Sequence, residues 1–138
     1  MMEYVYKNKF LQITYDAERK LMINTWLTEC KYMTDVDYKA QMMEYAERVE
    51  RYSPDVSMAD AINFLYTITP EIQNWTNTEF MPRFIGAGVK KQAFLVSKDL
   101  FSQVSVEQTM DQEQNINAFQ FRYFKSREEA LAWLIPEV

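Results

Sequence analysis

The sequence predicts an α/β fold: one domain over residues 1–138 with a mixed, mostly parallel sheet of about five strands, an N-terminal β-hairpin and four helices. A length of 138 residues suits one hydrophobic core. Two alternating apolar runs open the chain, and from residue 34 onward helical patterns alternate with short apolar runs. Strands that alternate with helices form parallel sheets with right-handed crossovers.

The first two strands are predicted at Phe10 to Asp16 and Lys20 to Trp26, where apolar and polar side chains alternate. The connection between them is short, so the two runs are expected to pair as an antiparallel hairpin. The upstream run Tyr4-Val5-Tyr6 either extends the first strand or packs loosely beside it.

A long helix is predicted to begin after Thr34, because Asp37 stands in the capping-box position three residues later. It ends at Ser53-Pro54. Its apolar residues recur at spacings of three and four, as in a helix that lies on a sheet. One stripe is Val36, Ala40, Met43, Ala46 and Val49, and the neighbouring stripe is Tyr38, Met42, Tyr45 and Tyr52.

The segment Val56 to Asn63 is predicted to be a central strand, with Asp60 and Asn63 near its end. A second helix is expected from Thr69 as N-cap, with Pro70 at its first position. Pro82 interrupts this helix, because proline removes a backbone donor.

The chain's two glycines, Gly86 and Gly88, are expected to end the second helix. The apolar run Ala93 to Val96 has no alternation, which is typical of a strand covered on both faces. Ser97 then caps a helix predicted to reach about Gln112, with Leu100, Phe101 and Val104 facing inward.

The polar residues 111–117 form a connection to the last strand, where Phe119, Phe121 and Tyr123 alternate with polar residues. This pattern indicates a half-exposed edge strand. A second capping box at Ser126 to Glu129 starts the C-terminal helix.

The composition excludes several classes of function. A net charge of −5 disfavours binding to nucleic acid and to anionic membranes, and no apolar run is long enough to span a bilayer. The chain has no histidine, which removes the commonest general base and metal ligand. Cys30 is the only cysteine, so no disulfide framework is expected and a cytoplasmic location fits.

Neither a dinucleotide-binding motif nor a phosphate-binding loop occurs in the sequence. The acidic pairs Asp35 with Asp37 and Asp60 with Glu71 are better explained by helix starts and loop hydrogen bonds than by a metal site or paired catalytic acids. We therefore expect no cofactor, no metal and no enzymatic activity. An enzyme that uses Asp or Glu alone is the least favoured alternative.

Two stretches carry a family resemblance: Gly88 to Phe101, and Phe121 to Leu134. They resemble the STAS-like (SpoIIAA-like) family, including its bacterial branch of STAS/SEC14 type. The resemblance implies the SpoIIAA-like fold and a non-catalytic regulatory role. Anti-sigma-factor antagonists of this type carry an Asp-Ser-Ser-Gly-like phosphorylation turn. The corresponding stretch Leu65 to Glu71 lacks the Asp-Ser pair and the glycine, and only Thr67 and Thr69 supply hydroxyls.

The leading hypothesis is a non-catalytic regulatory or protein-interaction domain with a protein partner. Its surface would be centred on Thr67, Thr69 and Glu71, because partners of open α/β sheets gather at strand ends. The two threonines are candidate phosphorylation sites, against the simpler alternative of an N-cap and a loop hydroxyl. Homodimerisation through the last strand or an aromatic face is also open.

The second hypothesis is a carrier of a small apolar ligand or lipid, held in a pocket lined by aromatic residues and methionines. Nine Tyr, nine Phe, three Trp and nine Met supply such residues. The helix broken at Pro82 would leave a cleft beside Trp75, Phe80 and Phe84. The simpler alternative is that these aromatic side chains belong to an ordinary core.

Overall fold

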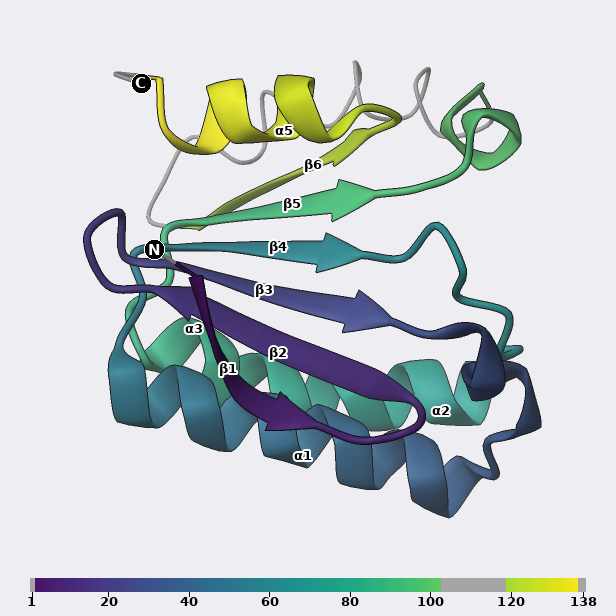
Figure 1. The fold of residues 1–138 in the computed structure, drawn as a ribbon. Helices are drawn as coiled ribbons and strands as arrows, with labels where there is room; N and C mark the ends of the chain where they lie inside the picture. Colours follow the sequence, from purple (N-terminus) through teal and green to yellow (C-terminus); the bar gives the residue numbers. More distant parts are fainter. Residues whose placement is uncertain (1, 103–118, 137–138) are drawn as a thin grey trace.

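The computed structural model describes residues 2–102 and 119–136. A mixed six-stranded sheet lies between two helical layers (Figure 1). The strands are β1 (Met2–Lys7), β2 (Leu11–Asp16), β3 (Leu21–Trp26), β4 (Val56–Asp60), β5 (Lys91–Leu95) and β6 (Gln120–Phe124). They lie in the sheet in chain order; β1, β2 and β3 pair antiparallel, and the pairs from β3 to β6 are parallel. The predicted α/β fold with its N-terminal hairpin is confirmed.

The helical segments follow the strands in alternation. They are the 3₁₀ turn η1 (Thr28–Tyr32), α1 (Asp35–Tyr52), α2 (Pro70–Trp75), the π-helical segment η2 (Thr76–Phe80), α3 (Met81–Gly86) and α5 (Arg127–Leu134). Figure 1 shows α1, α2 and α3 together on one face of the sheet and α5 on the other.

The prediction of about five strands was one strand short. The run Tyr4-Val5-Tyr6 belongs to β1, which pairs antiparallel with β2 through a register shift between Tyr4 and Tyr6. This strand was hard to recognise because it is half-exposed on both faces and shows no clean alternation.

Helix α1 starts with the predicted capping box. The Asp37 backbone N–H donates to Thr34 Oγ1 (3.1 Å), and the Thr34 N–H donates to Asp37 Oδ2 (3.0 Å). The predicted buried stripe was partly wrong, because Val36 is 75% exposed. Ala46 and Val49 of that stripe are buried, together with Tyr38 and Tyr45 of the tyrosine stripe.

The second helix is split, as the sequence predicts. Pro82 has no N–H to donate and its ring crowds the carbonyl four residues before it, so the backbone widens into η2 just ahead of α3. At the end of α3, Gly88 adopts φ +99°, a conformation that glycine reaches without strain. Gly88 N–H donates to the Ile85 carbonyl (3.0 Å) and closes the helix.

After β5, the Ser97 side chain accepts from the Leu100 N–H (3.3 Å), and helical conformation covers residues 98–102. Leu100 was predicted to face inward, but it is 42% exposed. The rest of that helix, with Val104 and Gln112, and the polar connection 111–117 lie outside the described residues. Within the described residues, strand β6 is the last strand at one edge of the sheet, where the sequence predicts an edge strand.

Each face of the sheet carries its own core. The face under α1, α2 and α3 combines aliphatic and aromatic residues: Phe10, Leu11, Ile13, Met22, Trp26, Cys30, Met33, Tyr38, Tyr45, Ala46, Val49, Ile72, Phe80, Phe84 and Val89. The face under α5 is mainly aliphatic: Leu21, Ile23, Val56, Met58, Ala93, Leu95, Phe124, Ala130 and Leu134.

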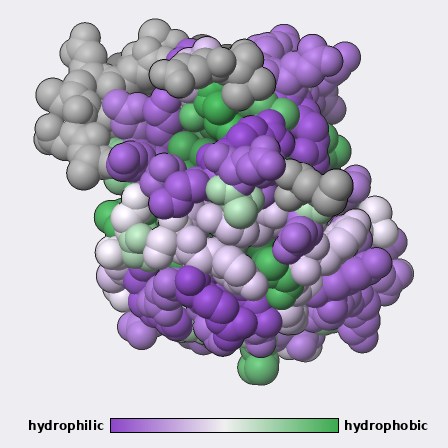
Figure 2. Space-filling model, turned by 60° about the vertical axis from the view of Figure 1, so that its left-hand side comes forward, coloured by the Kyte–Doolittle hydropathy of each residue, from purple (hydrophilic) through white to green (hydrophobic). Residues whose placement is uncertain are grey.

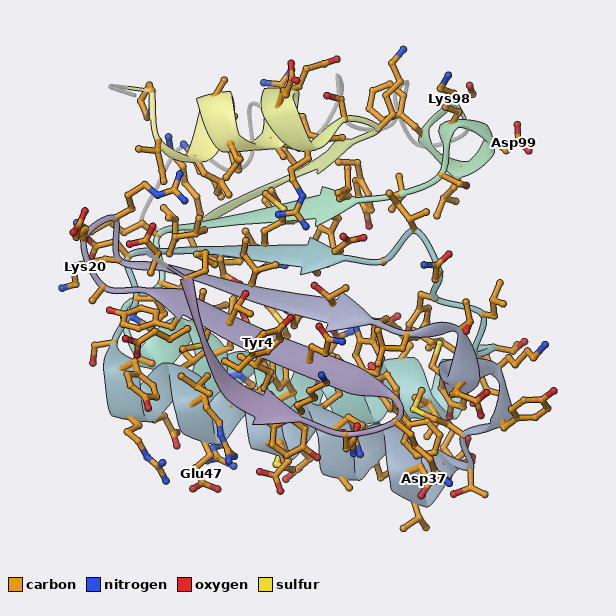
Figure 3. All side chains as sticks on the ribbon, viewed as in Figure 1. Tyr4, Lys20, Asp37, Glu47, Lys98 and Asp99 are labelled. Atoms are coloured by element: carbon orange, nitrogen blue, oxygen red, sulfur yellow. The ribbon has the colours of Figure 1, made fainter. Side chains whose placement is uncertain are left out.

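Charged side chains cover the outside. Glu47 and Asp37 project from α1 away from the sheet, Lys20 lies at one end of the sheet, and Lys98 and Asp99 lie at the other (Figure 3). Hydrophobic side chains appear as separate groups among hydrophilic ones (Figure 2). In the described part of the chain, no helix combines the length and apolar character needed to cross a lipid bilayer.

Candidate functional site

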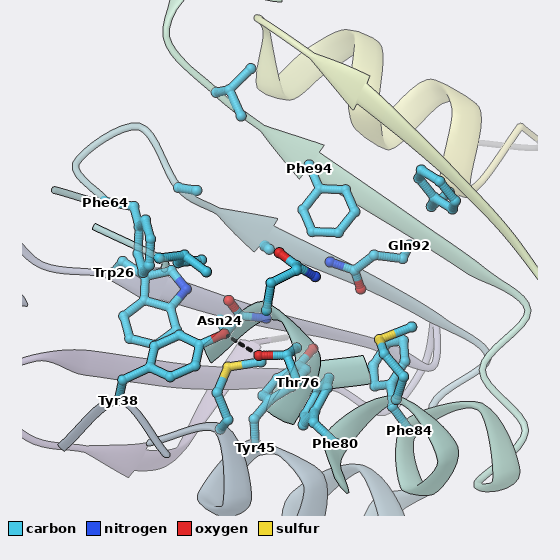
Figure 4. Close-up of a pocket in the computed structure, with 18 of the residues that line it drawn as sticks. Asn24, Trp26, Tyr38, Tyr45, Phe64, Thr76, Phe80, Phe84, Gln92 and Phe94 are labelled. Atoms are coloured by element: carbon cyan, nitrogen blue, oxygen red, sulfur yellow. Dashed lines mark hydrogen bonds between the residues drawn. The ribbon is translucent and has the colours of Figure 1, made fainter. Parts of the chain in front are cut away.

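A cavity of about 450 Å³ lies between the sheet and the layer of α1, α2 and α3 (Figure 4). This volume falls within the range of small-molecule sites, roughly 300–1,000 Å³. Most of its lining is aromatic or aliphatic. The lining residues are Leu11, Asn24, Trp26, Tyr38, Met42, Tyr45, Ala59, Ala61, Phe64, Ile68, Gln73, Thr76, Asn77, Phe80, Met81, Phe84, Gln92, Phe94, Val96, Leu100, Phe119, Phe121 and Tyr123.

The sheet supplies the floor of the cavity through strand register. Asn24 on β3 is paired with Ala59 on β4, Ala59 with Phe94 on β5, and Phe94 with Tyr123 on β6. Paired residues of neighbouring strands point to the same face of a sheet. These four side chains therefore form one row across the floor, which ends in the stacked rings of Phe94 and Tyr123, 5.0 Å apart.

A second row runs parallel to the first, one pleat away. It joins Met22, Ser57, Gln92 and Phe121 on the same four strands. In both rows the residue on the central strand β4 is small, Ser57 or Ala59. Of these two small residues, Ala59 lines the cavity, whereas Ser57 is fully buried and pairs with the Tyr45 hydroxyl.

The helical layer forms the opposite wall. The rings of Phe80 and Phe84, 5.4 Å apart and stacked, reach the cavity from η2 and α3. Helix α1 contributes Tyr38 and Met42. Because η2 is a π-helical segment, the backbone carries extra width where Phe80 enters the wall, and such segments occur often at functional sites.

Buried polar groups lie at one side of the floor. The Tyr45 hydroxyl is 2.5 Å from Ser57 Oγ and donates to the Met22 carbonyl at 3.3 Å. Burial raises the pKa of Tyr45 to about 12, while hydrogen bonds from Ser57 and Asn24 oppose the rise. Tyr45 is therefore neutral at physiological pH and fixes the side chains around it.

Among the described residues that line the cavity, Gln92 has a buried polar atom without a hydrogen-bond partner. Its side chain is 5% exposed and lines the cavity, and its Nε2 donates to the Ala93 carbonyl at 3.2 Å. Its Oε1 has no hydrogen-bond partner within residues 2–102 and 119–136. A buried acceptor without a donor lowers the stability of the fold by about 1–3 kcal/mol. A bound molecule that donates a hydrogen bond to this oxygen would recover part of that free energy.

The lining, as far as the structure describes it, contains no side chain with a full charge. On the helical side, the Tyr38 hydroxyl and Thr76 Oγ1 lie 2.9 Å apart, and Thr76 also donates to the Ile72 carbonyl (2.9 Å). Burial raises the pKa of Tyr38, so this hydroxyl also stays neutral. The arrangement suits an uncharged molecule, because an ion would lose its hydration without a counter-charge.

The residues predicted as an interaction or phosphorylation site lie in and after the loop that follows β4. Thr69 is the N-cap of α2: its side chain accepts from the Ile72 N–H at 3.3 Å. Thr67 is exposed in the loop, and Glu71 is exposed in the first turn of α2. The structure thus gives Thr69 a structural role.

The same loop is held at two points. Cys30 Sγ donates to the Asn63 carbonyl and accepts from the Leu65 N–H, both at 3.4 Å. The Tyr66 hydroxyl bonds to the Asp35 carboxylate, and burial together with this carboxylate raises the pKa of Tyr66. Cys30 is therefore a buried structural residue.

The structure brings two of the three predicted pocket residues to the cavity. Phe80 and Phe84 line it. Trp75 is instead half-buried at the end of α2, where its ring meets Tyr38 edge-on at 6.2 Å and Lys39 Nζ lies 5.6 Å from it.

Sequence reasoning missed Asn24 and Gln92, which supply the polar part of the floor. The signal for Asn24 was present, because it alternates with Met22 and Trp26 on the buried face of its strand. Gln92 directly precedes the apolar run Ala93 to Val96, and only the register with β4 shows that it faces the helices.

Neither a metal nor a cofactor site was predicted. Within the described residues, no three or more Cys, Asp or Glu side chains are grouped so as to hold a metal ion.

Comparisons with protein-family models, with curated proteins and with solved structures yield no match for this chain. The resemblance to the STAS-like family therefore stays a prediction. What the chain does must be inferred from its own residues.

Proposed function

We propose that this α/β domain binds a small, mostly apolar molecule in the cavity between its sheet and α1, α2 and α3. It serves either as a carrier of that molecule or as a regulatory domain that responds to it. The observation that carries the proposal is the cavity of about 450 Å³, whose walls are mainly aromatic and whose floor holds the buried polar side chains Asn24 and Gln92. Such a combination is typical of small-molecule sites.

The cavity is bordered by a position on the central strand that could hold a large core side chain. Ala59 places a small side chain on the central strand beside the cavity, where a larger apolar residue would fill the space and add stability. Phe94, on the neighbouring strand, remains only half-buried. A protein selected for stability alone would gain by closing this gap, so the open space supports a role in binding.

The experiment is non-denaturing mass spectrometry of the protein purified gently from cells that produce it. We expect an extra small-molecule mass on the wild type that is lost on denaturation. The Ala59→Leu variant, which places a larger side chain in the floor, should carry none. If the wild type and Ala59→Leu show identical bare masses, and solvent extracts of both hold no common compound, the binding function is wrong.

We also propose, as a second candidate, that the loop between β4 and α2 contacts a protein partner. Three apolar side chains of this loop are exposed: Ile62 by 46%, Leu65 by 57% and Ile68 by 39%. They flank Thr67, and together they form an apolar surface at the carboxyl ends of the parallel strands, where partners of such sheets gather.

A photo-crosslinking residue at Leu65 tests this candidate in living cells. Its control is the same residue at Glu47, which is exposed on the outer side of α1. A discrete adduct from position 65 alone would support a partner at the loop. Equal adducts from both positions, or none from either, would reject it.

A further inference from the structure

The cavity's chemistry narrows the ligand that it would hold. We infer that the ligand is an uncharged, flat aromatic molecule with a hydrogen-bond donor, an O–H or N–H group, directed at the side-chain oxygen of Gln92. This inference rests on the proposed binding function and specifies its ligand class.

The inference that the ligand is uncharged follows from the residues that line the cavity. No residue that lines the cavity in the described part of the chain is Asp, Glu, Lys or Arg. Transferring an ion into such a space without a counter-charge is strongly unfavourable. Fatty acids, phosphorylated metabolites and amino acids in their usual ionised forms are therefore poor candidates.

The flat shape follows from the walls. Phe80 and Phe84 are stacked on the helical side, and Phe94 and Tyr123 are stacked on the sheet side. Aromatic pairs gain about 0.5–1.5 kcal/mol beyond the area that they bury when they stack with offset or meet edge to face. A planar ring system between these two pairs can make such contacts on both sides.

The inference that the ligand carries a hydrogen-bond donor follows from the side-chain oxygen of Gln92. Its Nε2 is already engaged with the Ala93 carbonyl, and its Oε1 is left without a donor in the described residues. The neighbouring polar side chains are occupied: Tyr45 pairs with Ser57, and Asn24 also interacts with Tyr45. Gln92 is thus the floor group with unused hydrogen-bonding capacity.

Three probes of nearly equal size separate these requirements in calorimetric titrations of the full chain. Naphthalene presents the flat apolar body alone, 2-methoxynaphthalene adds an oxygen that only accepts, and 2-naphthol adds a donor. We expect 2-naphthol to bind about tenfold more tightly than 2-methoxynaphthalene, since one net hydrogen bond to a buried acceptor has this magnitude.

The variant Gln92→Met keeps the length of the side chain and removes its amide. In this variant we expect the preference for 2-naphthol to fall to about twofold or less, with the affinity for naphthalene retained. Gln12→Met is the matched control, because Gln12 lies on β2 and is not among the cavity residues. This control should keep the wild-type preference.

Gln92→Met should also melt at a temperature equal to or above that of the wild type, because an unpaired buried oxygen is replaced by an apolar group. If this variant does not fold, the three wild-type titrations still decide the matter. Equal binding of 2-naphthol and 2-methoxynaphthalene would overturn the inference while leaving the proposed function standing. Binding of none of the three would count against the proposed function itself.

Discussion

The two faces of the sheet are built from the same strands but from different kinds of residue. On β4, Val56 and Met58 face α5, whereas Ser57 and Ala59 face the other helices. The α5 face is mainly aliphatic, and several of its side chains are fully buried. The opposite face places aromatic rings together with Asn24 and Gln92 around a cavity. The α5 side is therefore a filled core, whereas the opposite side packs around a cavity.

The largest expected effect comes from two neighbours on β5. Leu95 is 2% exposed in the α5 core, so Leu95→Ala should lower the free energy of unfolding by about 2–5 kcal/mol. Phe94→Ala should cost less, although it removes more atoms, because Phe94 borders a space that already exists. Urea unfolding of the two variants measures both. A Phe94→Ala cost equal to or above that of Leu95→Ala would contradict the difference between the faces.

The second effect concerns alkaline pH. The pKa of Tyr45 is raised by burial from 10.0 to about 12, so the folded state holds the proton more tightly than the unfolded state does. The resulting stability is fully present below pH 10 and is lost as the pH rises through 12, by about 2–3 kcal/mol.

Urea unfolding of wild type and Tyr45→Phe between pH 8 and pH 12 isolates this contribution. The difference in unfolding free energy between the two proteins should change across that interval. A constant difference would show that Tyr45 is accessible to solvent and that the polar side of the floor is not closed.

A smaller effect distinguishes filling a cavity from overfilling a core. Ala59→Leu extends into the cavity and should leave the stability unchanged or raise it by about 0.5–2 kcal/mol. Ala93 precedes Phe94, the β5 partner of Ala59, and is fully buried on the α5 face. Ala93→Leu should therefore lower the free energy of unfolding by about 1–3 kcal/mol. Thermal unfolding compares them. Equal destabilisation by both would mean that the cavity is not available space.

The smallest expected change in stability is at the loop between β4 and α2. Thr69→Ala removes the N-cap of α2 and should lower the free energy of unfolding by about 1 kcal/mol, with ligand binding unchanged. If the stability stays the same while crosslinking from Leu65 disappears, Thr69 would be a contact residue instead of a cap.

The sequence carried enough information for most of the fold. The alternation of apolar and polar residues predicts the hairpin, the capping box at Thr34 predicts the start of α1, and Pro82 predicts the break between α2 and α3. Each of these is a local property of the chain. The half-exposed strand β1 was not assigned, because it pairs at an edge and needs no clean alternation.

The site was harder to foresee than the fold. The helix break at Pro82 points to Phe80 and Phe84, which line the cavity, whereas Trp75 is not among the lining residues, because it packs against Tyr38. Gln92 and Ala59 become site residues only through the register of β4 and β5. The segments α2, η2 and α3 separate β4 from β5, so no tight turn fixes the register of this pair, and the pattern within one strand does not show which residues of the other lie beside it.

The most direct test is a titration of methyl-labelled methionines with 2-naphthol, followed by nuclear magnetic resonance. Met42 and Met81 line the cavity, whereas Met58 is buried on the α5 face and serves as an internal control. We predict that the Met42 and Met81 signals shift together and saturate while the Met58 signal stays in place. Signals that stay still at every concentration, or a Met58 shift as large as the others, would contradict the claim that this face of the sheet is a binding site.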